Sequence, residues 1–565
     1  MLITLATSRA GELMSRPLGY ASSKVRKAIE MVTDEYARSA LDFLASQSDV
    51  TQFRTFHTAG CTQGFFYGNP NLVIASWIGL PLHGTDFGWG KEIHVGPGAL
   101  GFDGKGFIIP GHDEDGSLGT YTVKPAESTP KMHLPISEFD QFMALHATLI
   151  YFYRPDNSNP FSVASAIETL KNSLSQVLVH FYPLAGRLHW TGNGGRVELH
   201  CNAMGALLYE AETDAKIDDF GDFRPTPELR ALIPSVDYTS PIHELPLFLV
   251  QLTKLSCGGI SLGLAISHII VDGTSAFHFI AEWARIARGE PLDKVPFLDR
   301  TVLLARDPPT PPRFDHAEFS PPPLLIGQSD NNEEKNKETT VAMLHLSKTQ
   351  VEILKNMANV NRAADIRAYS RYEAVAGHLW RCACKARKLE SEQLTRLRVA
   401  VNFRNRLRPP LPPGYFGNAI LITAATSRAG ELVSKPLGYA SCRVREASEM
   451  VTDEYTRSAL DFAASQLDVT RFRISHTGGY TQGLSYGNPN IGITSWIGLP
   501  IYGADFGWGK EIHMGTGVLE YDGRSFILPG PDEDGSLLIA LRLQVAHMDA
   551  FKKFFHELGL YEGFF

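Results

Sequence analysis

The sequence predicts an α/β protein of two lobes, preceded by a partial copy of its own C-terminal region. Stretches with the apolar spacing of strands and of helices follow one another along the chain, which is typical of layered α/β folds. A proline-rich and polar stretch at 306–340 interrupts them and predicts a surface crossover between two lobes. Residues 2–118 recur at 421–537 without a gap, and about three quarters of the 117 positions are identical.

The duplication sets the domain organisation that we expect. The sequence between the copies occurs only once, so one complete enzyme with an extra piece explains the chain better than two equivalent domains. Two distant copies also do not make a solenoid. The predicted parts are a partial duplicate of the C-terminal lobe at 1–118, an N-terminal lobe at 119–305, a crossover linker at 306–340 and a C-terminal lobe at 341–565.

Composition and charge exclude several classes of protein. Hydrophobic residues at 44% and charged residues at 20% are ordinary for a globular chain. The net charge of −8 and the lack of a long basic run argue against a nucleic-acid partner. No stretch approaches 18 uninterrupted apolar residues, so we expect no membrane span. The N-terminal segment recurs internally at 420–429, so we expect it to be structural sequence and not a targeting signal.

The cysteines predict reduced thiols and no metal site. None of them forms a CxxC pair or another metal-ligand spacing. Reduced cysteines are the rule in the cytoplasm, so we expect a cytoplasmic protein without a bound metal. The six are Cys61, Cys201, Cys257, Cys382, Cys384 and Cys442.

Elements of the first lobe follow from apolar spacing. A strand-like alternation begins near Tyr121, where the repeat ends. A helix opens at Ser162, and residues 259–268 alternate between large apolar and small side chains, which predicts a strand. A second helical pattern begins after Gly273. The apolar face of the first helix consists of Val163, Ile167, Leu170, Leu174, Val177 and Leu178.

The second lobe follows the crossover. Seven prolines between 308 and 323 precede a polar run at 330–337, as expected of a long surface connection. Beyond it, the spacing predicts a helix at 371–385 and a strand at 397–401.

The sharpest candidate for chemistry is the pair His268 and Asp272. His268 ends the strand predicted at 259–268, where a sheet can hold its ring toward a cleft. Histidine titrates near neutral pH, so His268 could serve as a general base. The alternative is that His268 is a polar strand terminus and that Asp272 caps the next helix. The capping role of Asp272 is compatible with either interpretation.

No nucleophile motif accompanies this histidine. The segment Gly273-Thr274-Ser275-Ala276-Phe277 lacks the closing glycine of a GxSxG elbow. A base without an enzyme nucleophile suits direct attack by an acceptor substrate on an activated acyl donor. The triplet Asp505-Phe506-Gly507 also occurs in kinases, but the other kinase motifs are absent from the sequence.

Two motifs in this order resemble the signatures of plant BAHD acyl-CoA-dependent acyltransferases. They are the HxxxD motif from His268 to Asp272 and the DFGWG motif formed by Asp505, Phe506, Gly507, Trp508 and Gly509. The stretches at 181–187 (FYPLAGR) and 415–418 (YFGN) are also similar to family sequences. The resemblance extends from about residue 121 to the end of the chain.

The resemblance implies a fold and a reaction. The fold is that of chloramphenicol acetyltransferase-like proteins: two similar α/β lobes with mixed central sheets and a channel between them. An acyl-CoA co-substrate enters from one face and the acceptor from the other, and no cofactor is permanently bound. His268 removes a proton from the acceptor, which attacks the thioester. The family is usually monomeric, so we expect a monomer.

The resemblance also assigns site residues. Asp272 points away from the channel and positions His268 through a salt bridge, with Arg404 or Arg406 as its partner. Thr494 and Trp496 match residues that stabilise the oxyanion in hydroxycinnamoyltransferases of the family.

Two further roles carry over from the family. The DFGWG motif at 505–509 is structural. Tyr151 resembles a tyrosine that lines the substrate pocket.

Several acceptors fit these motifs. The stretches at 121–127 and 543–548 are most similar to spermidine hydroxycinnamoyltransferases, so a polyamine amine is the first expectation. The alternative is O-acylation of shikimate or quinate. Such enzymes carry an arginine that binds the acceptor carboxylate, and at that position this chain has Arg473 or Ile474. A catalytically silent relative that only binds ligands is the third possibility.

The resemblance explains the repeat. The first copy corresponds to part of the second lobe and lacks the HxxxD motif. It carries Ala75 where the second copy has Thr494, although Trp77 and a DFGWG stretch at 86–90 are retained. We therefore expect residues 1–118 to be catalytically inactive. They could be the product of a gene fusion, or they could compete with residues 421–537 for the same place in the second lobe.

Overall fold

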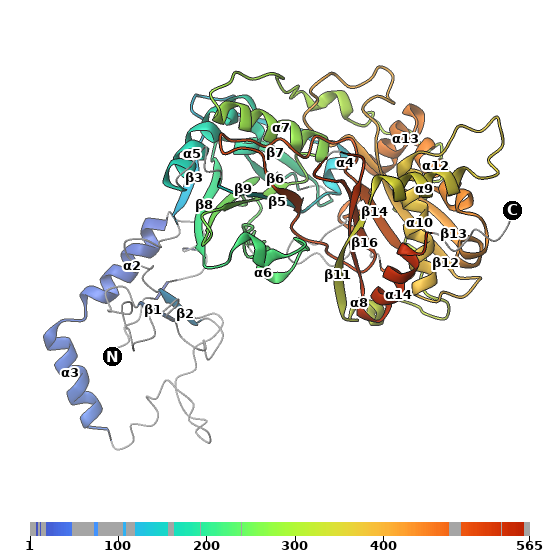
Figure 1. Cartoon of the computed structure of the whole chain (residues 1–565). Coiled ribbons are helices and arrows are strands. Elements are labelled where there is room, and N and C mark those ends of the chain that lie inside the picture. The colour runs from blue at the N-terminus through green and yellow to red at the C-terminus, as the bar shows by residue number, and fades with distance from the viewer. Residues whose placement is uncertain are drawn as a thin grey trace. The chain divides into compact units, whose positions relative to one another are not determined.

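The computed structural model describes residues 7–8, 12, 18–47, 73–76, 105–108, 119–155, 163–192, 194–238, 240–473, 487–532 and 534–558. The chain separates into two compact units, Met1–Asp115 and Gly116–Phe565 (Figure 1). The division between them lies close to residue 119, where we expected the N-terminal lobe to begin. The second unit contains both lobes.

A six-stranded mixed sheet forms the centre of the N-terminal lobe, in the order β15-β5-β10-β9-β8-β3. Neighbouring strands are antiparallel, except for the parallel pair β8 and β9. Helices α5 (Val163–His180) and α7 (Gly273–Ala287) share one apolar core with this sheet. The strands are β3 (Thr120–Val123), β5 (His146–Tyr153), β8 (Ala206–Thr213), β9 (Phe248–Leu255), β10 (Ile260–Ser267) and β15 (His513–Thr516).

A smaller sheet of three strands, in the order β4-β7-β6, completes the N-terminal lobe. Short helices α4 (Glu138–Gln141) and α6 (Pro227–Arg230) connect its larger elements. The three strands are β4 (Met132–Leu134), β6 (Arg187–Trp190) and β7 (Val197–Cys201).

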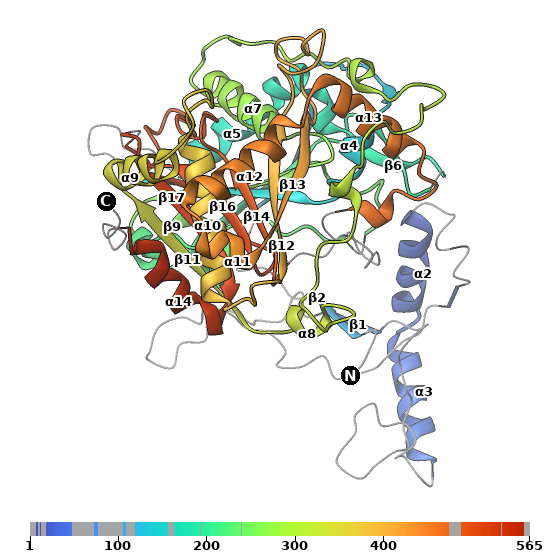
Figure 2. The same ribbon diagram turned by 90° about the vertical axis from the view of Figure 1, so that its right-hand side faces the viewer.

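The C-terminal lobe repeats this architecture with a second six-stranded mixed sheet, in the order β11-β17-β16-β14-β12-β13. Helices α10 and α12 lie in front of this sheet in Figure 2. The strands are β11 (Thr339–Leu346), β12 (Leu394–Asn402), β13 (Ile420–Arg428), β14 (Ile491–Ser495), β16 (Arg524–Pro529) and β17 (Leu537–Gln544). The helices are α9 (Lys348–Asn359), α10 (Arg371–Ala386), α11 (Ala429–Ser434), α12 (Leu437–Glu449), α13 (Asp453–Ala464) and α14 (Val545–His556).

The crossover at 306–340 packs against the C-terminal lobe. The backbone N–H of Arg306 donates to Asp461 at 3.1 Å, and that of Arg313 donates to the Ser458 hydroxyl at 3.0 Å. Both acceptors belong to α13. The crossover also contains the short helix α8 (Asn332–Lys335) before β11 begins.

The predicted α/β architecture of two lobes with mixed sheets is confirmed. The helix expected at 371–385 is α10, which Ser370 and Glu373 begin with a reciprocal capping box. The strand expected at 259–268 is β10, whose large apolar residues face α5 and α7. Among the described helices, none is both long and apolar enough to cross a membrane.

The first unit contains four described elements. They are α2 (Leu18–Glu30), α3 (Asp34–Ala45), β1 (Val73–Ser76) and β2 (Lys105–Ile108). Strands β1 and β2 pair in parallel. Ala75 lies in β1, whereas Trp77 and the DFGWG stretch at 86–90 lie outside the described residues.

Candidate active site

His268 stands at the point where β10 ends and α7 is about to begin. Its backbone N–H donates to the carbonyl of Leu145 at 2.8 Å, so the residue is fixed against β5. Asp272 follows as the N-cap of α7 and accepts the N–H of Ser275 at 3.0 Å. The capping role predicted for Asp272 is therefore present, and it coexists with the ion pair described next.

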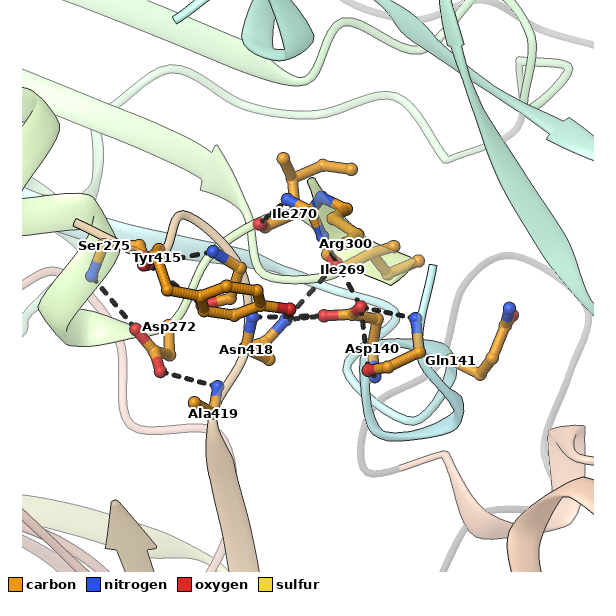
Figure 3. A network of polar contacts seen from close by, with 12 residues as sticks. Asp140, Gln141, Ile269, Ile270, Asp272, Ser275, Arg300, Tyr415, Asn418 and Ala419 are labelled. Atoms are coloured by element: carbon orange, nitrogen blue, oxygen red, sulfur yellow. Dashed lines mark hydrogen bonds and ion pairs between the residues drawn. The ribbon is translucent and has the colours of Figure 1, made fainter. Parts of the chain in front are cut away.

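Asp272 forms a buried, two-pronged ion pair with Arg404. The two guanidinium nitrogens Nη1 and Nη2 donate to its two carboxylate oxygens at 2.5 and 2.9 Å. The N–H of Ala419 adds a third bond at 2.9 Å, as Figure 3 shows. Burial by itself would raise the pKa of Asp272, but these donors outweigh burial and hold the pKa below its usual value. Arg404, and not Arg406, is thus the partner of Asp272.

Arg406 has a different role. Its Nη1 donates to the carbonyl oxygens of Ser448, at 2.5 Å, and Val451, at 3.2 Å, where α12 ends. These bonds place positive charge at the carbonyl end of a helix, which is a favourable position for it. Arg406 therefore stabilises the C-terminal lobe.

Asn418 contacts the imidazole of His268 directly. Its Oδ1 lies 3.2 Å from His268 Nδ1, on the side of the ring opposite Nε2. Burial lowers the pKa of His268, while Asp272 and the bond to Asn418 partly counteract burial. The lowered pKa keeps His268 neutral, and able to accept a proton, at neutral pH. The sequence pointed to the YFGN stretch but not to this contact.

A cavity of about 200 Å³ lies where the two lobes meet, and His268 is part of its wall. The walls come from both sheets, because the lining includes residues of β10 and α7 as well as of β12, β14 and β16. Among the lining residues are His268, Thr494, Trp496, Glu520, Arg524 and Phe526. The structure thus brings three of the predicted catalytic residues, His268, Thr494 and Trp496, to one cavity, with Asp272 at its edge.

Thr494 and Arg524 meet on neighbouring strands of the C-terminal sheet. Nη1 of Arg524 donates to the Thr494 hydroxyl oxygen at 2.8 Å. A hydroxyl that accepts a bond still has its own hydrogen to donate, so Thr494 can hydrogen-bond an oxyanion in the cavity. Arg524 also lies over the Phe526 ring, 4.3 Å from its centroid, and near Glu520. No motif in the sequence indicates a role for Arg524.

Trp496 is largely buried beside the cavity. Its ring makes edge contacts with Phe277, at 5.7 Å between centroids, and Phe526, at 5.1 Å. These contacts hold the indole between α7 and β16. Trp496 thus packs between the lobes and also contributes to the cavity wall.

The DFGWG segment forms a turn that packs against the N-terminal lobe. Phe506 lies against Trp283 of α7, at 4.8 Å between centroids, and Trp508 lies against Tyr153 of β5, at 5.3 Å. The Asp505 carboxylate accepts the N–H groups of Gly507 and Gly509 at 2.8 and 3.0 Å. None of these five residues lines the cavity that contains His268, so their position agrees with a structural role.

Tyr151 lies outside the cavity to which the resemblance assigned it. Its side chain is fully buried among the apolar residues that join β5 to α5 and α7. The cavity wall instead includes Ala147, Thr148 and Leu149, from the half of β5 that follows Leu145. Tyr151 lies further along the strand, beyond the cavity.

Arg473, the candidate for binding an acceptor carboxylate, is also turned away from the cavity. Its guanidinium donates to the carbonyls of Gln141 at 3.2 Å and Gly195 at 2.6 Å. Ile474, the alternative residue, lies outside the described residues.

In the part of the chain that the structure describes, no group of three or more His, Cys, Asp or Glu side chains is placed so that it could hold a metal ion. Five cysteines lie in that part, and all five are free thiols: Cys201, Cys257, Cys382, Cys384 and Cys442. Cys61 lies outside it.

Comparison with known proteins identifies the family of the chain. The sequence matches the Transferase family over residues 1–122 and 117–558. It is 52% identical over 441 residues to the hydroxycinnamoyl-CoA:piscidic acid hydroxycinnamoyltransferase of Actaea racemosa, covering 77% of this chain and 98% of that protein. It is 45% identical over 439 residues to the shikimate O-hydroxycinnamoyltransferase of Nicotiana tabacum, with the same coverage.

Solved structures agree on the fold. TRI101 of F. graminearum, complexed with coenzyme A and T-2 mycotoxin, superposes with a TM-score of 0.63 at 17% identity, over 75% of this chain and 97% of that one. The sequence motifs, the two-lobed fold and the family match agree with one another. The chain is an enzyme that uses an acyl-CoA as co-substrate, and it belongs to the Transferase family of BAHD acyltransferases.

Proposed function

We propose that this protein transfers a hydroxycinnamoyl group from its CoA thioester to a hydroxyl group of a small organic acid, with His268 as the general base. The two relatives described above are named for a hydroxycinnamoyl donor and for piscidic acid or shikimate as acceptor. The observation that carries the proposal is the cavity in which His268, Thr494 and Arg524 meet.

The proposed reaction needs one base and one oxyanion donor. Nε2 of His268 takes the proton of the acceptor hydroxyl while the hydroxyl oxygen attacks the thioester carbonyl. The carbonyl oxygen becomes an oxyanion, which the hydroxyl of Thr494 stabilises by a hydrogen bond. When the intermediate collapses, the carbon–sulfur bond breaks and the CoA sulfur receives the proton held by His268. The enzyme is then back in its starting state.

Arg524 supports an acidic acceptor. Its guanidinium lines the cavity beside Thr494 and can pair with a carboxylate. An acceptor held there would present its hydroxyl on the side of the cavity that contains His268. Arg473, in contrast, is occupied by backbone carbonyls away from the cavity. We therefore propose that Arg524 binds the acceptor carboxylate in this enzyme.

N-acylation of spermidine is the second candidate. The carboxylate of Glu520 lines the same cavity and could pair with an ammonium group of a polyamine. Two stretches of the sequence, at 121–127 and 543–548, also resemble spermidine hydroxycinnamoyltransferases. Glu520 lies 3.6 Å from Arg524, and this ion pair reduces the charge that either side chain offers to a substrate. We place the organic acid first because two relatives are named for organic-acid acceptors.

An acceptor panel tests both candidates. The purified full-length chain is incubated with caffeoyl-CoA or feruloyl-CoA and with shikimate, quinate, piscidic acid or spermidine, and products are identified by mass spectrometry. Esters of one or more acids without a spermidine amide would support the first candidate. Amide without any ester would replace it with the second, and no product with any acceptor would contradict both.

Two variants separate binding of the acceptor carboxylate from an effect on chemistry. Arg524→Gln should raise KM for an acid acceptor about tenfold or more, because a charged hydrogen bond is lost. The methyl ester of the same acid has no carboxylate, so its KM should change little. Glu520→Gln removes the negative charge beside Arg524, so it should lower the acid's KM or leave it as it is, and should not raise it. Equal losses for the acid and its ester in Arg524→Gln would contradict a carboxylate-binding role.

A further inference from the structure

A buried ion pair contacts Asn418, the residue that hydrogen-bonds the imidazole of His268. Asp140, at the end of the short helix α4, and Arg300, just before the crossover, are 0% and 1% exposed. Arg300 Nη1 lies 3.4 Å from Asp140 Oδ2, and Arg300 Nη2 donates to the carbonyl of Ile270 at 2.5 Å (Figure 3). Neither residue belongs to the motifs that the sequence singled out.

Asp140 holds Asn418 by both its backbone and its side chain. Asp140 Oδ1 accepts the backbone N–H of Asn418 at 3.2 Å and the side-chain Nδ2 at 2.7 Å. Nδ2 also donates to the carbonyls of His268 at 2.7 Å and Ile269 at 3.2 Å. All three groups are acceptors, so the NH2 group of Asn418, which has two hydrogens to donate, must face them, and its nitrogen end points away from the His268 ring.

The orientation of Asn418 decides where the proton of His268 resides. With Nδ2 turned toward Asp140, Oδ1 is the atom that faces His268 Nδ1 at 3.2 Å. A carbonyl oxygen accepts only, so Nδ1 must carry the proton and Nε2 must carry the lone pair. We propose that Asp140 and Arg300 are positioning residues that, through Asn418, hold His268 in the tautomer with a free Nε2.

The remaining contacts of Asp140 favour this role. Its Oδ2 accepts the backbone N–H of Ser137 at 2.8 Å and the Ser137 hydroxyl at 2.9 Å. Burial raises the pKa of Asp140, while Arg300, Asn418 and Ser137 counteract burial and stabilise the carboxylate that Asn418 contacts. When His268 becomes protonated during the reaction, the negative end of this chain of bonds stabilises the imidazolium. The other charged groups near His268 are Asp272 and Arg524.

The network also connects the two lobes. Three residues of the network come before the crossover: Asp140, His268 and Arg300. The other two, Asn418 and Arg404, lie on the connection from β12 to β13 in the C-terminal lobe. Arg404 holds Asp272, and Asn418 holds His268 itself. The tautomer of the base is therefore set only when the C-terminal lobe is docked against the N-terminal lobe.

Asp140→Asn tests the proposal, and Asp522→Asn is a matched control. Asp522 is also a buried carboxylate that accepts two backbone N–H groups, from Asn488 and Gln544, and pairs with an arginine, Arg387, at 2.8 Å. It does not line the cavity. Both changes should lower the melting temperature by similar amounts, because each leaves a buried arginine without its partner.

Only Asp140→Asn should change the chemistry. We expect kcat to fall about 10- to 100-fold with nearly constant KM, and the acidic limb of the kcat/KM profile to move to lower pH, because protonated His268 loses stabilisation. Asp522→Asn should keep kcat within about twofold and leave the pH profile unmoved. Equal kinetic behaviour of the two variants would reduce Asp140 to a structural residue and overturn the proposal.

Asn418→Ala provides a second measurement if Asp140→Asn does not fold. It should reproduce the fall in kcat and the shift of the acidic limb, and an unchanged profile would overturn the proposal. The inference rests on the proposed role of His268 as base, so a readout without turnover is needed as well. Nitrogen-15 NMR of histidine-labelled protein, with His268→Gln to assign the signal, should show protonated Nδ1. A proton on Nε2 would contradict the proposal, whatever the acceptor is.

Discussion

The two copies of the repeated segment form the same local structure in different surroundings. Helix α3 in the first copy and α13 in the second begin at equivalent threonines. Thr33 accepts the N–H of Tyr36 at 3.1 Å, and Thr452 accepts that of Tyr455 at 3.2 Å. Both helices are followed by a serine whose hydroxyl donates to a carbonyl in the last turn at 2.7 Å. The helix caps thus depend only on neighbouring residues in the chain, and they form in the same way in both copies.

Burial is where the two copies differ. No side chain of α3 is buried, whereas seven residues of α13 are. Leu41 is 66% exposed and its counterpart Leu460 is 2% exposed; Tyr36 is 42% exposed and Tyr455 is fully buried. The same amphipathic sequence therefore forms a helix in both copies, but it stabilises a core only where the rest of the lobe supplies a partner.

Strand pairing extends the comparison. Strands β1 and β2 pair in parallel with Ala75 opposite Phe107, and β14 and β16 pair in parallel with Thr494 opposite Phe526. These pairs occupy equivalent positions in the two copies, so the register belongs to the segment itself. The proposed oxyanion donor does not belong to the segment in the same way, because the first copy has Ala75 where the second has Thr494.

The largest expected effect is the loss of kcat on replacing His268, which has no counterpart in the first copy. His268→Ala should lower kcat about 10³- to 10⁴-fold, the upper part of what a general base contributes. The first copy has no HxxxD motif and cannot replace the base. Initial rates with saturating acyl-CoA and acceptor measure the effect. Retention of more than a tenth of the wild-type rate would refute the assignment of His268.

A pair of matched substitutions measures how much burial of the repeated helix contributes to the free energy of unfolding. Tyr455 is buried and its hydroxyl donates to Glu318 at 2.6 Å, so Tyr455→Ala should cost about 3–5 kcal/mol of unfolding free energy. Tyr36→Ala, at the equivalent exposed position, should change it by less than about 0.5 kcal/mol. Denaturant unfolding followed by circular dichroism gives both values. Similar losses would show that the first copy is packed as tightly as the second.

Making the second copy resemble the first should impair catalysis without unfolding the protein. Thr494→Ala introduces the residue that stands at position 75 and removes the proposed oxyanion donor. We expect kcat to fall about 10²- to 10³-fold. The reverse change, Ala75→Thr, should not affect the rate. Thr494→Ser, which keeps the hydroxyl, should retain most of the activity, and a fall as deep as that of the alanine variant would argue against a role as donor.

Acid should destabilise the second unit through buried histidines. Burial lowers the pKa of His146, His378 and His513 to about 4 each, while histidine in an unfolded chain titrates near about 6.5. Their stabilising contribution is complete above about pH 6.5. It is lost as the pH falls toward about 4, because the unfolded chain then binds more protons.

Each histidine contributes up to about 1.4 kcal/mol per pH unit to the slope of the unfolding free energy against pH. Melting temperatures measured between pH 7 and pH 4.5 should fall, and His378→Gln should flatten the dependence. The exposed His243→Gln is the control, since its change should leave the slope as it is. A dependence that His378→Gln does not alter would contradict the assignment.

The smallest expected effect is that of removing the first copy. The second unit has its own cores in both lobes, so deletion of residues 1–118 should change kcat/KM by less than about twofold. Steady-state kinetics and size-exclusion chromatography check this expectation. A loss of activity, or a change of oligomeric state, would instead indicate that the first copy takes the place of residues 421–537 in the second lobe.

Local features of the second unit could be predicted from the sequence. The apolar spacing of β10 and α10 and the capping box at Ser370 depend on neighbours in the chain, so each element was predicted to within a few residues. His268 and Asp272 were found because both lie in one short motif. Thr494 and Trp496 were found through the family resemblance, and the cavity includes both.

The remaining features depend on contacts between distant residues. Asn418 lies 150 residues after His268 and Asp140 lies 128 residues before it, so no spacing rule connects them. Arg524 enters the cavity because β16 pairs with β14 in a particular register. Tyr151 was expected in the pocket, but the cavity extends along β5 only over Ala147, Thr148 and Leu149, and Tyr151 lies beyond it in the apolar core.

Strand β15 has a mechanical consequence for the enzyme. Residues His513–Thr516 follow most of the C-terminal lobe in sequence, yet they form the edge strand of the N-terminal sheet beside β5. Separating the two lobes would break the pairing of these four residues with β5 and leave their backbone N–H and C=O groups without partners. Strand β15 therefore couples the two lobes mechanically. Wide separation of the lobes is disfavoured as a route for substrates to reach His268.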